Sequence, residues 1–141
     1  MPASYDPELD LIFQGIAVPI PWGSIQRDTR GGDVLYTNST IAIDADTGEI
    51  EWYFQHIPGG NWDLDHPFER IVVESTVTPL EENVSWINPD IKSVESRKLI
   101  TGIPGKPGII WTLDARTGEF LWAKETNSLF DDEAPRKTSS T

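Results

Sequence analysis

The chain has 141 residues and a formal net charge of −12, a length that suits one domain or part of a larger one. The acidic balance argues against a nucleic-acid-binding protein, because such proteins present a basic face to the phosphates. No cysteine is present, so disulfide bonds are excluded, and no apolar run approaches the roughly 20 residues of a membrane span.

Short runs of β-branched and aromatic residues follow one another along the chain, and none shows a sustained helical period. Because each run is bounded by Gly, Pro, Asn or Asp, the pattern predicts an all-β protein. The candidate strands are residues 10–17, 39–44, 49–55, 70–77, 97–103, 108–114 and 119–125. Residues 18–33 are rich in Pro and Gly and predict a loop, and the polar stretch 79–96 predicts an exposed insertion. The composition of residues 128–141 predicts a disordered tail.

An internal repeat is the most informative feature of the sequence. AIDADTGEIEW at residues 42–52 returns as TLDARTGEFLW at residues 112–122, an offset of 70 residues (112 − 42). Each copy predicts a β-hairpin, in which the Asp accepts backbone N–H groups in the turn and the Gly supplies a positive φ. A hairpin cannot bury both of its faces alone, so the repeat predicts stacked units.

The turn of the first copy, DADTGE, also invites comparison with a calcium-binding loop. An EF-hand places Gly at its sixth position and Glu at its twelfth, whereas Gly48 is fifth counting from Asp44. The second copy also has Arg116 where the first has Asp46. Calcium coordination by the same positions of both copies is therefore excluded, which favours a structural turn.

A pair of carboxylates, Asp63 and Asp65, lies in the stretch NWDLDH. In an extended backbone, residues i and i+2 point to the same side, with Cα atoms about 7 Å apart. Two like charges at that separation repel unless a cation or a shared proton relieves them. The pair is therefore a candidate metal or acid–base site, with a simple solvated loop as the alternative. His56 and His66 are interpreted as loop residues rather than ligands.

The pattern A-x-D-x-x-T-G-x-x-x-W of residues 42–52 resembles the tryptophan-docking motif of quinoprotein alcohol dehydrogenases. The second copy departs from it at Thr112, which stands in the Ala position. Neighbouring segments, YDPELDLIFQG, PW and GGDVLYTNST, extend the resemblance to roughly residues 4–125.

The resemblance implies an architecture. Members of this family are eight-bladed β-propellers that carry pyrroloquinoline quinone (PQQ), and each docking Trp packs against a neighbouring blade. Residues 1–127 are accordingly expected to form two partial-to-complete blades of such a propeller. The parent is several times longer, so the chain is expected to be a segment of it.

The resemblance also implies roles for three residues. Asp63 matches the catalytic base, which takes the hydroxyl proton of the alcohol and also contacts the metal. Asp65 matches the extra metal ligand of lanthanide-using members, and a hard trivalent ion suits an added carboxylate. Lys106, in PGKPGIIW, matches the basic residue that contacts PQQ. The implied cofactors are PQQ and a calcium or lanthanide ion.

One position departs from the family pattern. The family's metal-binding Asn falls at Val18 in this chain, and Ala17 replaces a Gly beside it. Valine has no donor atom, so this departure favours an atypical metal site or a second class of function. That alternative is a cofactor-free propeller repeat that serves as a protein-binding scaffold, or an inactive segment.

The resemblance further implies an alcohol substrate, a cytochrome c electron acceptor and a periplasmic location for the full-length parent. The first ten residues, MPASYDPELD, lack the basic start and apolar stretch of a signal peptide. Neither a nucleic-acid partner nor a membrane span is expected in this chain.

Overall fold

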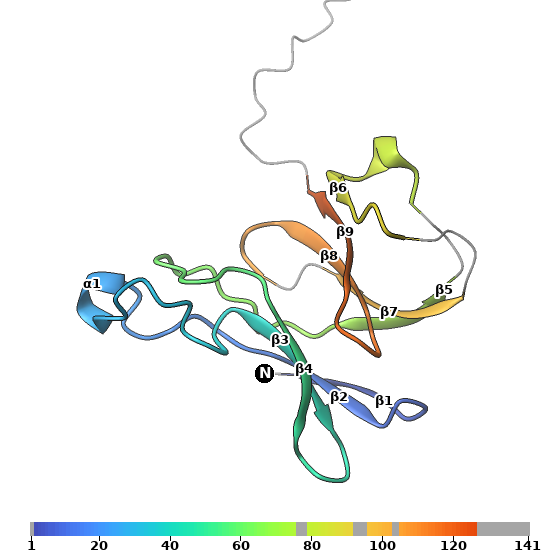
Figure 1. Ribbon diagram of the computed structural model, residues 1–141, viewed down its shortest axis with the longest axis horizontal. Helices are drawn as coiled ribbons and strands as arrows, with labels where there is room; N and C mark the ends of the chain where they lie inside the picture. The colour runs from blue at the N-terminus through green and yellow to red at the C-terminus, as the bar shows by residue number, and fades with distance from the viewer. Residues whose placement is uncertain (1, 76–78, 92–95, 103–104, 127–141) are drawn as a thin grey trace, which may run out of the picture.

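The computed structural model describes residues 2–75, 79–91, 96–102 and 105–126, and within them the chain forms two antiparallel β-sheets (Figure 1). The first sheet has the strand order β1-β2-β3-β4, and the second has the order β5-β7-β8-β9-β6. The strands of the first sheet are β1 (Ser4–Asp6), β2 (Leu11–Gly15), β3 (Ser39–Asp44) and β4 (Ile50–Gln55). Those of the second are β5 (Ile71–Ser75), β6 (Trp86–Ile87), β7 (Arg97–Gly102), β8 (Ile109–Asp114) and β9 (Phe120–Glu125). The prediction of an all-β protein is confirmed.

Each of the seven predicted strands is present, with ends that differ by a few residues. Two strands were not predicted, β1 and β6, because runs of three and two residues carry no measurable period. The stretch predicted as an exposed insertion contains the 3₁₀ turn η1 (Glu81–Asn83) as well as β6, which pairs with β9. Trp86 is exposed as predicted, but β6 belongs to the second sheet and is not an insertion, and the Trp86 ring stacks on the Phe120 ring at 4.4 Å. The predicted tail, 128–141, lies outside the described residues.

The loop predicted at residues 18–33 contains one turn of helix, α1 (Ser24–Arg27). It extends to the same side of the molecule as the connection that follows β4 (Figure 1). Two hydrogen bonds join them: Arg27 Nη2 donates to the Gly60 carbonyl at 3.0 Å, and the Ser24 amide donates to Asn61 Oδ1 at 3.0 Å. In the described part of the chain, no helix has the length and apolarity required to cross a membrane.

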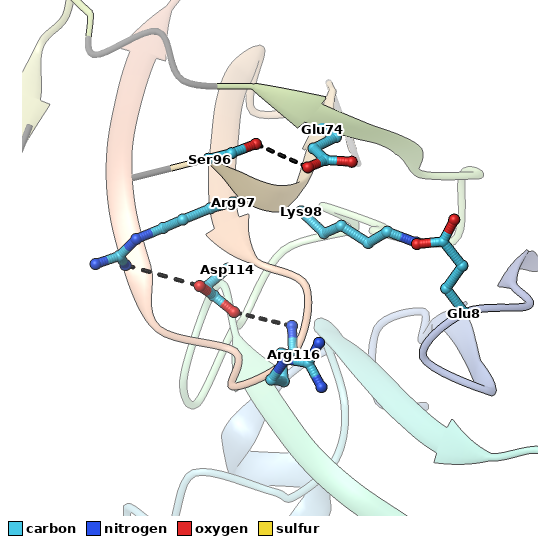
Figure 2. A pocket seen from close by; sticks show the side chains of 7 residues that line it. All are labelled: Glu8, Glu74, Ser96, Arg97, Lys98, Asp114 and Arg116. Atoms are coloured by element: carbon cyan, nitrogen blue, oxygen red, sulfur yellow. Dashed lines mark hydrogen bonds and ion pairs between the residues drawn. The ribbon is translucent and has the colours of Figure 1, made fainter. Parts of the chain in front are cut away.

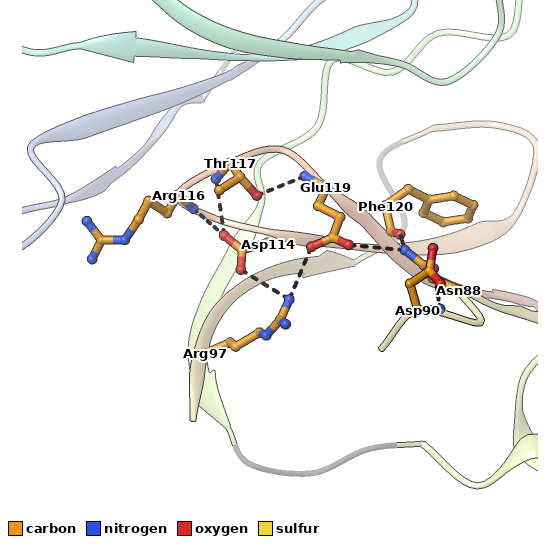
Figure 3. Close-up of polar contacts among 8 residues, drawn as sticks. All are labelled: Asn88, Asp90, Arg97, Asp114, Arg116, Thr117, Glu119 and Phe120. Atoms are coloured by element: carbon orange, nitrogen blue, oxygen red, sulfur yellow. Dashed lines mark hydrogen bonds and ion pairs between the residues drawn. The ribbon is translucent and has the colours of Figure 1, made fainter. Parts of the chain in front are cut away.

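Both repeats form the predicted β-hairpins. Asp44 Oδ1 accepts the amides of residues 46 and 47 at 3.1 and 2.6 Å. Asp114 Oδ1 accepts the amides of residues 116 and 117 at 2.9 and 3.1 Å, and Figure 3 shows this second turn. Gly48 and Gly118 have φ values of 76° and 73°, where a side chain is unfavourable. The local turn chemistry read from the sequence therefore accounts for the hairpins.

The two sheets meet through the tryptophan of the first hairpin. Trp52, on β4, donates its indole N–H to the Ala115 carbonyl of the second hairpin at 3.2 Å. Its ring lies directly over the turn, since a Cβ atom placed on Gly118 would be 2.6 Å from Trp52 Cε3. The buried core joins both sheets and consists of Leu11, Phe13, Ala42, Ile100 and Ala115. The expectation that this Trp packs against a neighbouring blade is confirmed.

The corresponding tryptophan of the second hairpin, Trp122 on β9, lines an open and mainly apolar groove of about 290 Å³. Leu99 and Ile110 contribute to the same groove from β7 and β8. The second hairpin thus repeats the first, with its tryptophan beside an open groove.

Candidate active site

The connection from β4 to β5, residues 56–70, carries both predicted carboxylates and has no helix or strand of its own. It passes beside the connection between β7 and β8, which carries Lys106. The Lys106 amide donates to the Asp65 carbonyl at 3.2 Å. Gly105 makes this approach possible, because a Cβ atom at that position would lie 2.0 Å from the same carbonyl oxygen.

The side chains of the three predicted site residues meet at one point. Lys106 Nζ donates to Asp63 Oδ2 at 2.7 Å and to Asp65 Oδ2 at 2.8 Å. The cation that relieves the repulsion of the carboxylate pair in this structure is therefore Lys106 itself. The cluster is accessible, with side-chain exposures of 45% for Asp63, 23% for Asp65 and 43% for Lys106.

This arrangement perturbs the ionisation of two of the three groups. The Lys106 hydrogen bond is the main cause that lowers the pKa of Asp65, although partial burial acts in the opposite direction. The hydrogen bonds to Asp63 and then Asp65 raise the pKa of Lys106. An ionised Asp65 and a protonated Lys106 are thus the favoured states near neutral pH.

Val18, where the resemblance places a metal-binding Asn, also lies at the cluster. Its backbone N–H donates to Asp65 Oδ1 at 3.2 Å, so the connection after β2 contributes a hydrogen bond there. The valine side chain contributes no oxygen or nitrogen atom. Trp62, which directly precedes Asp63, is 74% exposed.

Three buried residues near the cluster were not predicted to matter. His66 is fully buried, and its ring stacks on the ring of His56 at 4.7 Å with an interplanar angle of 5°. Burial lowers the pKa of His66 to about 4 and that of His56 well below its ordinary value, so both rings are neutral near pH 7. Arg70 is also buried and donates to the Thr40 hydroxyl. No motif or spacing in the sequence signals these contacts, which join residues on separate strands and loops.

A second polar cleft, of about 260 Å³, lies where β7 and the second hairpin face the β1–β2 connection (Figure 2). Its charges pair with one another: Lys98 Nζ is 2.8 Å from Glu8 Oε2, and Arg97 Nη1 is 3.7 Å from Asp114 Oδ2. Lys98 also pairs with the buried Asp6 of β1 at 2.7 Å. The Lys98 pairs cross from the second sheet to the first, whereas the Arg97 pair joins β7 and β8 within the second sheet. The cleft is therefore interpreted as a structural contact between the sheets.

The comparisons with known proteins agree on one family. A family model described as "Glucose/ethanol/alcohol dehydrogenase, beta-propeller domain" matches residues 1–141. The quinohemoprotein alcohol dehydrogenase of Comamonas testosteroni is 34% identical over 122 residues, which are 86% of this chain and 15% of that protein. The putative dehydrogenase XoxF of Paracoccus denitrificans is also 34% identical over 122 residues, 86% of this chain and 17% of that protein.

Solved structures support the same relationship. The crystal structure of the Comamonas testosteroni enzyme superposes with a TM-score of 0.73 at 29% identity, covering 90% of this chain and 17% of that one. A europium-containing methanol dehydrogenase superposes with a TM-score of 0.71 at 29% identity, covering 87% of this chain and 18% of that one. The chain therefore spans about a sixth of the length of the relatives that it matches.

Proposed function

This chain belongs to the glucose/ethanol/alcohol dehydrogenase β-propeller family, and we propose that it supplies part of the active site of a PQQ-dependent alcohol dehydrogenase. The observation that carries the proposal is the convergence of Asp63, Asp65 and Lys106 on one point, although Lys106 is 43 and 41 residues away from the two carboxylates along the chain. The alternative of a protein-binding scaffold gives no physical reason to hold two carboxylates together beside a lysine.

The donor set fits a hard metal ion. Asp63 and Asp65 each direct an Oδ2 atom at the same cation, the Lys106 ammonium, and carboxylate oxygens are the ligands that calcium and lanthanide ions prefer. Among the described residues, no group of three or more His, Cys, Asp or Glu is suited to a metal. We therefore propose that these two carboxylates hold the metal together with further ligands from outside the described residues. The second carboxylate favours a trivalent ion, and the similarity to a europium-containing methanol dehydrogenase supports that preference.

In the proposed reaction, Asp63 is the general base. Its carboxylate takes the hydroxyl proton of the alcohol as the carbon–hydrogen bond breaks. PQQ, when bound, would supply the two-electron acceptor for the hydride, and a metal held by Asp63 and Asp65 would supply Lewis acidity. Asp63 is suited to this role because its side chain is 45% exposed and can be reached by a small substrate. The exposed Trp62 ring beside it offers an apolar surface for the carbon chain of the alcohol.

Lys106 is proposed to contact PQQ and to balance charge. Its ammonium already neutralises one of the two negative charges of the carboxylate pair. A fixed cation at this point also stabilises negative charge that develops beside it, and a preorganised donor does so without rearrangement. Asp65 in turn holds the Lys106 side chain through its Oδ2 atom and holds the β2 connection through the Val18 amide.

The proposal extends to the setting of the full-length protein. The relatives are named as alcohol dehydrogenases, which supports an alcohol as substrate. A cytochrome c electron acceptor and a periplasmic location are part of the same proposal.

The test uses a polypeptide of full family length that carries this segment, assayed by alcohol-dependent dye reduction with PQQ and metal. Asp63→Asn keeps the shape of the side chain but removes the base, so kcat should fall by about 10²–10⁴-fold while PQQ still binds. Glu69→Gln is the matched control, because Glu69 is an exposed carboxylate in the same connection. This substitution should leave kcat unchanged. Wild-type turnover in Asp63→Asn would show that the catalytic assignment is wrong.

The scaffold alternative is favoured by one observation, the absence of a donor atom in the Val18 side chain. It predicts that the full-length polypeptide binds neither PQQ nor metal. Equilibrium dialysis against PQQ, with and without calcium or a lanthanide, separates the two functions without any assay of turnover.

A further inference from the structure

The middle of the connection that carries Asp63 and Asp65 is buried although it has no regular structure. His66 has no solvent exposure, and the parallel rings of His56 and His66 stack with centroids 4.7 Å apart. His56 Nε2 is hydrogen-bonded to the Thr40 hydroxyl of β3 at 2.8 Å. The connection is therefore held against the first sheet at the residue that directly follows Asp65.

The His66 region is also enclosed by backbone on two sides. A Cβ atom at Gly15 would lie 2.4 Å from the His66 carbonyl oxygen. A Cβ atom at Gly105 would lie 2.9 Å from His66 Cδ2 and 2.0 Å from the Asp65 carbonyl oxygen. Contacts this close leave the backbone of Asp65 and His66 little room to move.

Arg70 adds a third restraint. Its guanidinium donates to the His66 carbonyl at 2.9 Å and to the Thr40 hydroxyl at 2.8 and 2.9 Å, and it also donates to the Phe68 carbonyl. It is 5% exposed, and among the described residues no carboxylate forms an ion pair with it. Arg70 is thus a buried cation whose hydrogen bonds go to backbone carbonyls and not to a carboxylate, and these bonds fix the conformation of the connection.

We propose that His66 is a positioning residue, whose ring sets the backbone of Asp65 against Gly105 and Lys106 so that Asp63 and Asp65 meet the Lys106 ammonium. The hydrogen bond from the Lys106 backbone amide to the Asp65 carbonyl, at 3.2 Å, links the backbone beside the buried ring to the cluster. The catalytic meaning of this positioning rests on the proposed function, whereas the geometric part does not.

The flat shape of the His66 ring carries the effect. Neither of its ring nitrogens is hydrogen-bonded to a side chain among the described residues. Burial lowers the pKa of the ring, and an interaction with the backbone of Leu64 acts in the opposite direction. The two imidazole rings are parallel, so their in-plane lone pairs run side by side and cannot converge on one ion at bonding distance. Stacking and close packing are therefore the main interactions through which the ring itself acts on the connection.

The experiment measures the Lys106 ammonium directly. In the 141-residue chain labelled with ¹⁵N, the two carboxylates are expected to protect the Nζ protons of Lys106 from exchange and so to give a cross-peak at low temperature. The lysine Nζ cross-peak that is lost in both Asp63→Asn and Asp65→Asn is assigned to Lys106. His66→Ala should remove this cross-peak while the Trp52 indole cross-peak, which reports on sheet packing, stays in place. His66→Phe keeps a flat ring and should retain the Lys106 signal. Leu121→Ala is the control for general destabilisation, since Leu121 is a buried residue of β9, and it should also retain the signal.

An unchanged Lys106 cross-peak in His66→Ala would overturn the proposal, and so would its loss in both His66→Phe and Leu121→Ala. These outcomes are independent of turnover. Failure of the proposed function would appear instead as full dye reduction by Asp63→Asn, with the Lys106 signal still sensitive to His66. In the full-length polypeptide, His66→Ala should also weaken metal binding by about 10–100-fold, as loss of groups that orient ligands does.

Discussion

Replacing the two turn glycines by alanine should separate the cost of local strain from the cost of disturbing the contact between the sheets. Gly48 and Gly118 occupy the same position of the repeat and have nearly the same φ, 76° and 73°. They differ in their surroundings. A Cβ atom at Gly48 would have nothing within 4 Å, whereas one at Gly118 would lie 2.6 and 2.8 Å from two atoms of the Trp52 ring.

The magnitudes follow from these contacts. A side chain in the left-handed region costs about 1–2 kcal/mol, so Gly48→Ala should lower the free energy of unfolding by that amount. Gly118→Ala has the same local cost and must also displace a rigid, packed indole ring. Overpacking of this kind costs about 1–3 kcal/mol, which is the expected difference between the two variants.

Urea denaturation followed by far-UV circular dichroism measures both variants against the wild-type chain. A double-mutant cycle completes the test, because in a Trp52→Ala background the ring is gone and Gly118→Ala should cost no more than Gly48→Ala. Equal losses of stability for the two glycine variants in the wild-type background would refute the reasoning that Trp52 docks on the second turn.

Three further predictions concern the site, the charges between the sheets and the open face. In the full-length polypeptide, Asp65→Ala should weaken binding of a trivalent ion more than binding of calcium, and Val18→Asn should strengthen binding of both ions. Metal titrations in which Asp65→Ala leaves the preference for the trivalent ion over calcium unchanged would show that Asp65 is only a loop residue. Burial by itself would raise the pKa of Asp6, but hydrogen bonds from Lys98 and from two backbone amides lower it overall. Its contribution to stability should therefore be present above its ordinary value of 3.8 and be lost as the pH falls through the lower folded value, and Asp6→Asn should flatten that dependence in urea midpoints. The isolated chain should self-associate through the face around Trp122, and sedimentation velocity measures this. It should also show no PQQ-dependent dye reduction, so a monomer that reduces the dye would contradict this prediction.

Much of the fold could be predicted because its signals are local. The Asp at the start of each hairpin turn and the Gly near its end act on backbone within a few residues, so DADTG and DARTG specify hairpins wherever they stand. Strands such as β2 alternate buried and half-buried side chains, which is the period of a pleated strand. β6 escaped prediction because its two residues become a strand only through pairing with β9.

For the site, the sequence alone predicted that Asp63 and Asp65 lie close together, because residues two apart in an extended backbone point to the same side. The structure instead turns at Asp63, where the Leu64 amide donates to the Trp62 carbonyl at 2.8 Å. The resemblance, and not any spacing, pointed to Lys106. Only the tertiary structure decided that its ammonium lies between the two carboxylates, 2.7 and 2.8 Å from them. Only the tertiary structure also buried His66 against His56 behind them. The physical reason is that these contacts join separate connections, whose separation is set by the packing of one sheet on the other and by no rule that acts along the chain.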